Sequence, residues 1–235
     1  MKTFVGMMLG CGLLAGCGDV PGGDSVSASG TGGGAAVYAA KCAACHGAAA
    51  EGNQALRSPS LAGLPDWYLQ RQLDHYRQGL RGYAEGDVMG QQMRTMAELL
   101  PAKDDPALIA FLSEMAPVPT TPTLEGDVER GRKLFGQHCS RCHRYNGSGE
   151  KLFGSPPLVA LPDWYLEEQI EKFRSGTRGT KEGDIHGQKM GTIAKQHLKE
   201  DEIRDVLVYV AELAQNPPTG DVEVDEDALP EVPDF

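Results

Sequence analysis

One short motif, Cys-x-x-Cys-His, occurs twice in this sequence and constrains the fold more than any other feature. It reads CAACH at residues 42–46 and CSRCH at residues 139–143. This order is the attachment signature of a c-type haem, in which both thiols bond to the haem vinyl groups and the histidine binds the iron. The motifs predict two covalently bound haems c, held by four thiols and two proximal imidazoles: Cys42, Cys45, Cys139 and Cys142, with His46 and His143.

A zinc site is the alternative for two cysteines at this spacing. Structural zinc takes four ligands, usually with a second cysteine pair nearby. Here the other pair lies 97 residues away, in its own copy of a repeat. The ligand count therefore favours haem, and a histidine after each pair makes a structural disulfide a poor explanation.

The region around each motif is duplicated as a whole. A shift of 97 residues aligns both motifs and the segment LPDWYL at residues 64–69 and 161–166, without a gap. The repeat predicts two tandem domains, at residues 35–118 and 126–216. A proline-rich linker is expected at residues 119–125.

Apolar residues within each repeat follow helical spacing. Leu69, Leu73, Tyr76 and Leu80 recur at i, i+4, i+7 and i+11, which predicts a helix in the middle of the first repeat. Similar patterns precede each motif and close each repeat, and no segment shows strand alternation. The predicted fold class is therefore all-α.

Together these features resemble class I cytochromes c, and the duplication resembles their dihaem branch, the cytochromes c4. The resemblance covers residues 35–216 and rests on C-x-x-C-H, a later Ser-Pro-x-Leu segment, the Trp-Tyr-Leu helix, one methionine and a final aromatic helix. It implies an electron carrier that is not an enzyme. Redox proteins such as a membrane oxidase or reductase complex are the expected partners, with no small-molecule substrate and no nucleic acid. A subunit of a membrane oxidoreductase, a dihaem peroxidase and a haem-based sensor are the alternatives.

The repeat selects one methionine in each domain as the sixth iron ligand. Met93 and Met190 each lie 47 residues after the histidine of their motif. A thioether is a soft donor that favours Fe(II) and raises the haem potential. Met89 and Met96 flank the first site, but neither recurs in the second repeat, where His186 replaces Met89. Matched methionines also disfavour a peroxidase, which needs an open iron.

The resemblance assigns further residues around each haem. The carbonyls of Pro59 and Pro156 are expected to accept the N–H of the proximal imidazole, which fixes the ring orientation. Gly34 and Gly131 match the place where a small residue lets the terminal helix cross close to the first helix. Indole and guanidinium groups are candidates to hold the haem propionates: Trp67, Arg77 and Arg81, with Trp164, Arg174 and Arg178 in the second copy.

The first residues predict export and a lipid anchor. Lys2 precedes an apolar run over residues 4–16, which is typical of a secretory signal and too short to span a membrane. The sequence LAGC that ends at Cys17 is similar to a bacterial lipoprotein signal, so residues 1–17 are expected to be a signal with Cys17 lipidated. Ordinary cleavage is the alternative. The anchor would place the protein on the periplasmic side of a membrane, with residues 18–34 as a flexible tether.

Charge is distributed unevenly along the chain. The formal net charge is −11, and an acidic tail at residues 217–235 contributes much of it. Small residues surround the first motif, whereas Lys133, His138, Arg141 and Arg144 surround the second, which predicts that an acidic partner docks on the second domain. The other histidines, His75 and His197, and His138 itself are expected to be surface residues.

Overall fold

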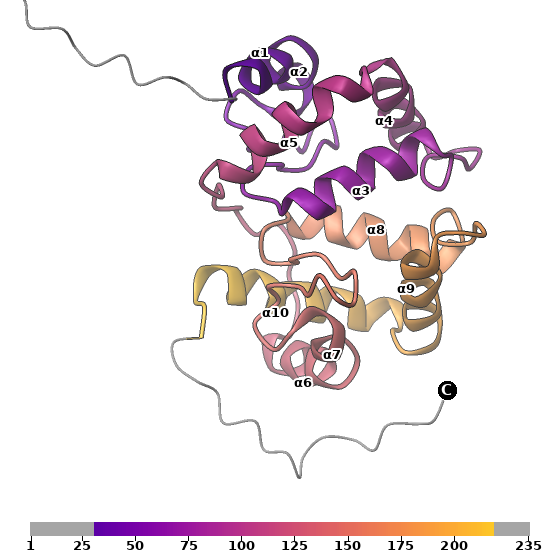
Figure 1. The fold of residues 1–235 in the computed structure, drawn as a ribbon. Helices are drawn as coiled ribbons and strands as arrows, with labels where there is room; N and C mark the ends of the chain where they lie inside the picture. Colours follow the sequence, from indigo (N-terminus) through magenta and orange to yellow (C-terminus); the bar gives the residue numbers. More distant parts are fainter. Residues whose placement is uncertain (1–30, 219–235) are drawn as a thin grey trace, which may run out of the picture.

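The computed structural model describes residues 31–218, which form two similar helical halves (Figure 1). Within this range there is no β-strand, only two isolated bridges, Asn53–Ser58 and Glu150–Ser155. The all-α class and the two tandem domains are therefore confirmed. The predicted signal at residues 1–17 lies outside the described residues, as do most of the tether and most of the acidic tail. No helix between residues 31 and 218 is both long and apolar enough to cross a membrane.

Five α-helices and one short 3-10 helix make up the first domain. The 3-10 helix, η1, leads directly into the last α-helix. α1 starts before residue 35, so the end of the predicted tether is helical. The elements are α1 (Thr31–Lys41), α2 (Ala43–His46), α3 (Asp66–Arg77), α4 (Val88–Leu99), η1 (Ala102–Asp104) and α5 (Asp105–Glu114).

The second domain repeats this order, with one long closing helix in place of η1 and α5. In Figure 1 it lies below the first domain, and α8 faces α3 across the boundary between them. Its helices are α6 (Val128–His138), α7 (Ser140–His143), α8 (Asp163–Ser175), α9 (Ile185–Gln196) and α10 (Glu200–Gln215).

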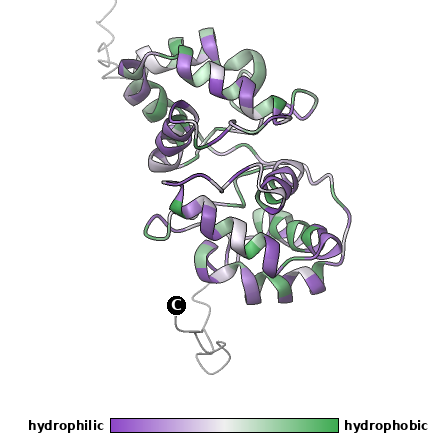
Figure 2. Ribbon diagram, turned by 90° about the vertical axis from the view of Figure 1, so that its right-hand side faces the viewer, coloured by the Kyte–Doolittle hydropathy of each residue, from purple (hydrophilic) through white to green (hydrophobic). Residues whose placement is uncertain are grey.

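Each domain has its own core, built from one face of each amphipathic helix. In α3 the predicted stripe is buried at Leu69, Leu73 and Tyr76, while Leu80 lies beyond the end of the helix. Figure 2 shows hydrophobic and hydrophilic residues sharing single helices in both halves, as expected of helices with one face in a core.

The first and last helices of each domain cross at a glycine. A Cβ on Gly34 would overlap the carbonyl of Ala107 in α5, and a Cβ on Gly131 would overlap the carbonyl of Asp205 in α10. α1 accordingly packs on α5, and α6 packs on α10. The crossing implied by the resemblance is confirmed, and it supports the short helix that carries each histidine of the motifs.

Candidate functional site

Each motif histidine is buried and held in one orientation by a carbonyl. The Nδ1 atom of His46 lies 2.8 Å from the carbonyl oxygen of Pro59, and that of His143 lies 3.0 Å from the carbonyl oxygen of Pro156. A carbonyl only accepts, so Nδ1 donates its proton and Nε2 keeps a free lone pair. A metal-ligating histidine needs this tautomer. Pro59 and Pro156 therefore make the contact with the motif histidine that the resemblance implies.

Burial also favours the uncharged imidazole that a metal requires. It lowers the pKa of both His46 and His143, and the hydrogen bond to the proline carbonyl only partly opposes this shift. A neutral ring with an exposed lone pair is the state that binds iron. The two histidines therefore fit the proximal role in chemistry as well as in position.

The motif cysteines lie beside these histidines as free thiols. Cys42 and Cys139 are partly buried, and burial raises the pKa of the Cys42 thiol to about 11 and that of Cys139 to about 12. Zinc binds thiolates, and an environment that resists the thiolate form disfavours zinc. An uncharged thioether suits the same surroundings. Cys42 and Cys139 therefore fit covalent haem attachment better than zinc.

The candidate distal ligands lie on equivalent helices. Met93 is on α4 and Met190 is on α9, and both side chains are half-buried against the core. Among the competitors, Met96 is 36% exposed and His186 is exposed beside Gly154. Burial thus distinguishes the repeated methionines from Met96 and His186.

Two arginines meet between the domains without an acidic partner. Arg81 donates to Gln72 at 2.6 Å, to Tyr165 at 2.7 Å and to Gln169 at 3.0 Å. Arg178 donates to Gln169 at 2.8 Å and to Gln72 at 3.1 Å. Every partner is neutral, and within residues 31–218 the ion pairs include neither guanidinium. Burial and the charge of Arg81 lower the pKa of Arg178.

Buried cations require anions, and a haem brings two propionate carboxylates. The other two candidate arginines already have acids: Arg77 binds Asp105 at 2.5 Å, and Arg174 binds Glu171 at 3.2 Å. Arg81 and Arg178 are therefore the arginines of this set that fit propionates. The cluster joins equivalent positions of the two repeats, since Gln72 and Arg81 become Gln169 and Arg178 after the shift of 97 residues. Sequence reasoning missed the glutamines because a polar residue on a helix face gives no signal for an interface.

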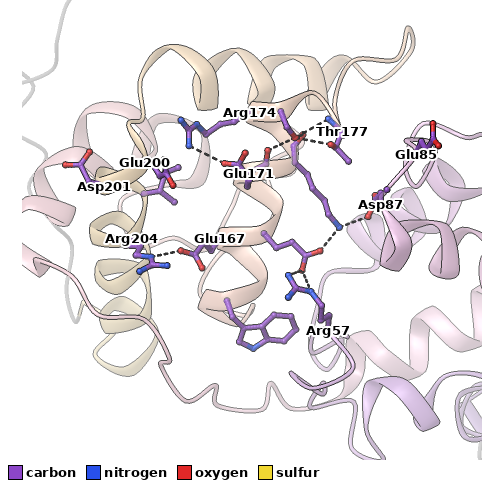
Figure 3. Close-up of a pocket in the computed structure, with 16 residues that line it drawn as sticks. Arg57, Glu85, Asp87, Glu167, Glu171, Arg174, Thr177, Glu200, Asp201 and Arg204 are labelled. Carbon is purple, nitrogen blue, oxygen red and sulfur yellow. Dashed lines mark hydrogen bonds and ion pairs between the residues drawn. The ribbon is translucent and has the colours of Figure 1, made fainter.

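The two tryptophans both lie near the domain boundary. Trp67 packs under the guanidinium of Arg71, at 4.9 Å from the ring centroid, and Arg71 donates to the carbonyl of Gly154 in the second domain. Trp164 lines an open groove of about 1010 Å³ between α8, α10 and the first domain (Figure 3). Each basic side chain that lines this groove pairs with one of its acidic side chains. Neither motif histidine and neither candidate distal methionine lines it.

The sequence pattern of the cytochrome c family matches residues 33–116 and 128–214, which is most of the chain and covers both domains. The chain belongs to the cytochrome c family. Its two tandem domains make it an electron-transfer cytochrome, and the family implies covalently bound haem c.

Two curated relatives share one name. A protein named "Thiosulfate dehydrogenase electron acceptor" from Stutzerimonas stutzeri is 34% identical over 192 residues, covering 79% of this chain and 84% of the relative. A protein of the same name from Thiomonas intermedia is 36% identical over 156 residues, covering 60% of this chain and 65% of the relative. The chain thus spans just under two thirds of one relative and most of the other.

Solved structures lead to the same family. The thiosulfate dehydrogenase TsdBA of Marichromatium purpuratum matches with a TM-score of 0.63 and 29% identity, over 86% of this chain and 44% of that one. The reduced cytochrome c4 of Pseudomonas stutzeri matches with a TM-score of 0.59 and 26% identity, over 77% of this chain and 97% of that one. The resemblance to cytochromes c4 is therefore confirmed.

One expectation is contradicted by these matches. The residues and the resemblance predicted a carrier that is not an enzyme, whereas the relatives are named for thiosulfate dehydrogenase and one matching structure is a thiosulfate dehydrogenase. Residue patterns could not indicate this link, because an electron acceptor of an enzyme and a free carrier need the same haem ligands.

Proposed function

We propose that this chain is a dihaem cytochrome that accepts electrons from a thiosulfate dehydrogenase. The observation that carries the proposal is the pair of buried histidines, each with Nδ1 committed to a proline carbonyl, beside the free thiols of a haem-attachment motif. The names of the relatives support thiosulfate dehydrogenase as the electron donor.

The residues of the chain have distinct tasks in this proposal. Haem c supplies reversible one-electron chemistry when bound. Pro59 and Pro156 would orient His46 and His143 toward the iron, and Met93 and Met190 would be the second protein ligands of the two irons. Arg81 and Arg178 would hold haem propionates at the boundary between the two domains.

Thiosulfate-driven reduction tests the proposed donor. The oxidised protein, mixed with a catalytic amount of a purified thiosulfate dehydrogenase and excess thiosulfate, should be reduced by two electrons per chain, followed by haem absorbance. Thiosulfate without the dehydrogenase should reduce it far more slowly. Reduction no faster with the dehydrogenase than without it would refute the assignment of the donor.

Methionine ligation has its own spectroscopic test. Met93→Ala and Met190→Ala should each remove the methionine-to-iron charge-transfer band of one haem and lower its potential, because axial ligands set haem potentials over roughly 0.8 V. Met96→Ala is the matched control on α4 and should leave both bands intact. An unchanged band in Met190→Ala, together with a loss in His186→Ala, would assign the second iron to histidine instead.

We also propose that Cys17 carries a lipid and holds the protein on the periplasmic face of a bacterial membrane. The LAGC sequence and the apolar run before it support this, and both lie outside the described residues. Cys17→Ser should move the protein from the membrane fraction to the soluble fraction or leave its signal uncleaved. Wild-type protein recovered soluble with an unmodified Cys17 would contradict the proposal.

A further inference from the structure

Both methionine-bearing helices begin at an aspartate that caps their first turn. An Asp87 carboxylate oxygen accepts from Gly90 N–H at 3.0 Å, and one of Asp184 accepts from Gly187 N–H at 2.8 Å. A Cβ at either glycine would overlap this carboxylate, so glycine is needed for the tight cap. Such a cap satisfies a backbone N–H group that the helix itself leaves unpaired, and it stabilises the first turn.

Each capping aspartate is contacted by a residue of the other domain. Lys172 of α8 lies 2.7 Å from Asp87, and Nδ1 of His75 in α3 lies 3.8 Å from Asp184. All four side chains are largely buried, with Asp87 and Asp184 each 4% exposed, Lys172 16% and His75 15%. The expectation that His75 is a surface residue is therefore wrong.

These contacts obey the internal repeat. His75 and Lys172 occupy the same position in the two repeats, as do Asp87 and Asp184. The contact that α8 makes with the first domain is therefore equivalent in position to the contact that α3 makes with the second domain. Lys172 also lies 2.6 Å from Glu168, which lies 2.7 Å from Arg57, and the dashed lines in Figure 3 follow this chain of contacts between Asp87 and Arg57.

We propose that Lys172 is a positioning residue: it crosses the interface and fixes Asp87, which begins the helix carrying the candidate distal methionine of the first domain. The proposal rests on the His/Met ligation proposed above. It makes the interface part of the first iron site, because loosening this cap frees the first turns of the helix whose methionine must reach the iron.

The two contacts differ in strength. Lys172 holds Asp87 by an ion pair of 2.7 Å in the lining of the open groove. Burial lowers the pKa of His75, and the charges of Arg178, Arg71 and Arg81 act in the same direction against the opposing effect of Asp184. His75 is therefore neutral at pH 7 and lies 3.8 Å from Asp184, beyond hydrogen-bond distance, so α9 lacks the ionic contact that α4 has. The first iron site should depend on the interface more than the second.

The Met190→Ala background isolates the first site, because only the band due to Met93 remains. In that background Lys172→Gln should lower the temperature at which the band disappears by about 4 °C or more, the shift expected from roughly 1 kcal/mol in a domain of this size. Arg174→Gln, which removes a cation from the same helix but only an ion pair within the second domain, is the matched control and should cause little shift. Lys172→Arg should restore most of the wild-type value.

A second route to the same contact is Asp87→Asn, which keeps a capping side chain and removes the charge. Like Lys172→Gln, it should lower the temperature at which the band disappears. The double variant should lower this temperature by less than the sum of the two single changes, since the residues act as a pair. Additive losses would overturn the proposal. The proposal would also be overturned if Lys172→Gln left the temperature at which the band disappears unchanged from its background, or lowered it no more than Arg174→Gln does.

The equivalent contact, between His75 and Asp184, gives a further comparison. In the Met93→Ala background at pH 7, only the band due to Met190 remains. His75→Gln should lower the temperature at which this band disappears by less than Lys172→Gln lowers it for the band due to Met93. An equal or larger shift would overturn the inferred difference between the two sites. Failure of the proposed ligation gives a different result. If the wild-type protein shows no methionine charge-transfer band, the proposed ligands are wrong. A normal band whose thermal stability does not change in Lys172→Gln refutes only the positioning role.

Discussion

Arg81 and Arg178 are cations whose hydrogen-bond partners in the structure are all neutral. A charge taken out of water is costly unless an opposite charge accompanies it. Glutamine and tyrosine oxygens satisfy the N–H groups of Arg81 but do not balance its charge. Propionates from both domains would supply that balance, which makes these residues sensitive reporters of bound haem.

We expect Arg81→Gln to lower the midpoint potentials of the haems. A positive charge close to the iron favours the reduced state, and a unit charge about 10 Å away changes the potential by roughly 70 mV at an effective dielectric constant near 20. Spectroelectrochemical titration measures the change. Arg77→Gln is the matched control, because Arg77 is already paired with Asp105 and should affect stability more than potential. Unchanged potentials in Arg81→Gln would place the propionates elsewhere.

His75 makes stability depend on pH. Its pKa is lowered in the folded protein, mainly by burial, so between that value and about 6.5 the unfolded chain binds more protons than the folded one. The free energy of unfolding should therefore be highest above about pH 6.5 and should fall as the solution becomes more acidic. Burial lowers the pKa of His138 and His186 in the same direction.

Urea titrations between pH 5 and 7.5 measure this dependence. In His75→Gln the loss of stability on acidification should be smaller than in the wild-type protein, because one group that must take up a proton is gone. His197→Gln is the comparison variant, since this histidine is exposed and stacks on His138 within the second domain. Identical pH profiles for wild type and His75→Gln would show that His75 does not contribute.

Sequence reasoning identified the candidate haem residues but not the residues that connect the domains. The motif, the prolines and the methionines lie at fixed distances along the chain, and each of them occurs in both repeats. Lys172, Gln72 and Gln169 act through contacts with the other copy, and an alignment of one repeat on the other shows equivalence without showing contact. His75 looked like a surface residue for the same reason.

The helices themselves were largely predictable, because their apolar stripes are long and regular. α3 was expected from the spacing of Leu69, Leu73 and Tyr76, and all three side chains are buried. The start of α1 was not expected, since Gly33 and Gly34 belong to a glycine-rich run that resembles a tether. Packing explains why this segment is helical. Gly34 has no side chain, which allows α1 to lie directly on α5.

The α6–α10 crossing yields a stability prediction. Gly131→Ala should destabilise the protein by about 1–3 kcal/mol, because the added Cβ meets the backbone carbonyl of Asp205 and the helices must separate. Gly136→Ala, on the same helix with no atom within 4 Å of the added Cβ, should instead stabilise it by about 0.5–1 kcal/mol. Thermal or urea unfolding measures both. A Gly131→Ala protein as stable as Gly136→Ala would show that the crossing is not tightly packed.

The molecule as a whole presents two unlike faces at its two motifs. Alanines surround the first motif, and the positions equivalent to Arg141 and Arg144 are Ala44 and Gly47. The two arginines around the second motif differ in their ion pairing. Arg144 is paired with Glu150, whereas Arg141 is exposed and takes part in none of the ion pairs found within residues 31–218. Arg141 should therefore contribute more to the attraction of an acidic partner than Arg144.

We expect electron transfer to an acidic acceptor protein to slow a few-fold at low salt in Arg141→Ala, in line with a charge contact worth up to about 1 kcal/mol in water. The effect should shrink as ionic strength rises, because the Debye length falls to about 8 Å at physiological salt. Arg144→Ala is the matched comparison and should change the rate less, since its loss also frees Glu150. Stopped-flow kinetics over a range of salt concentrations measures all three proteins. If Arg141→Ala keeps both the wild-type rate and the wild-type salt dependence, the partner docks on another surface, and the apolar surroundings of the first motif become the face to examine.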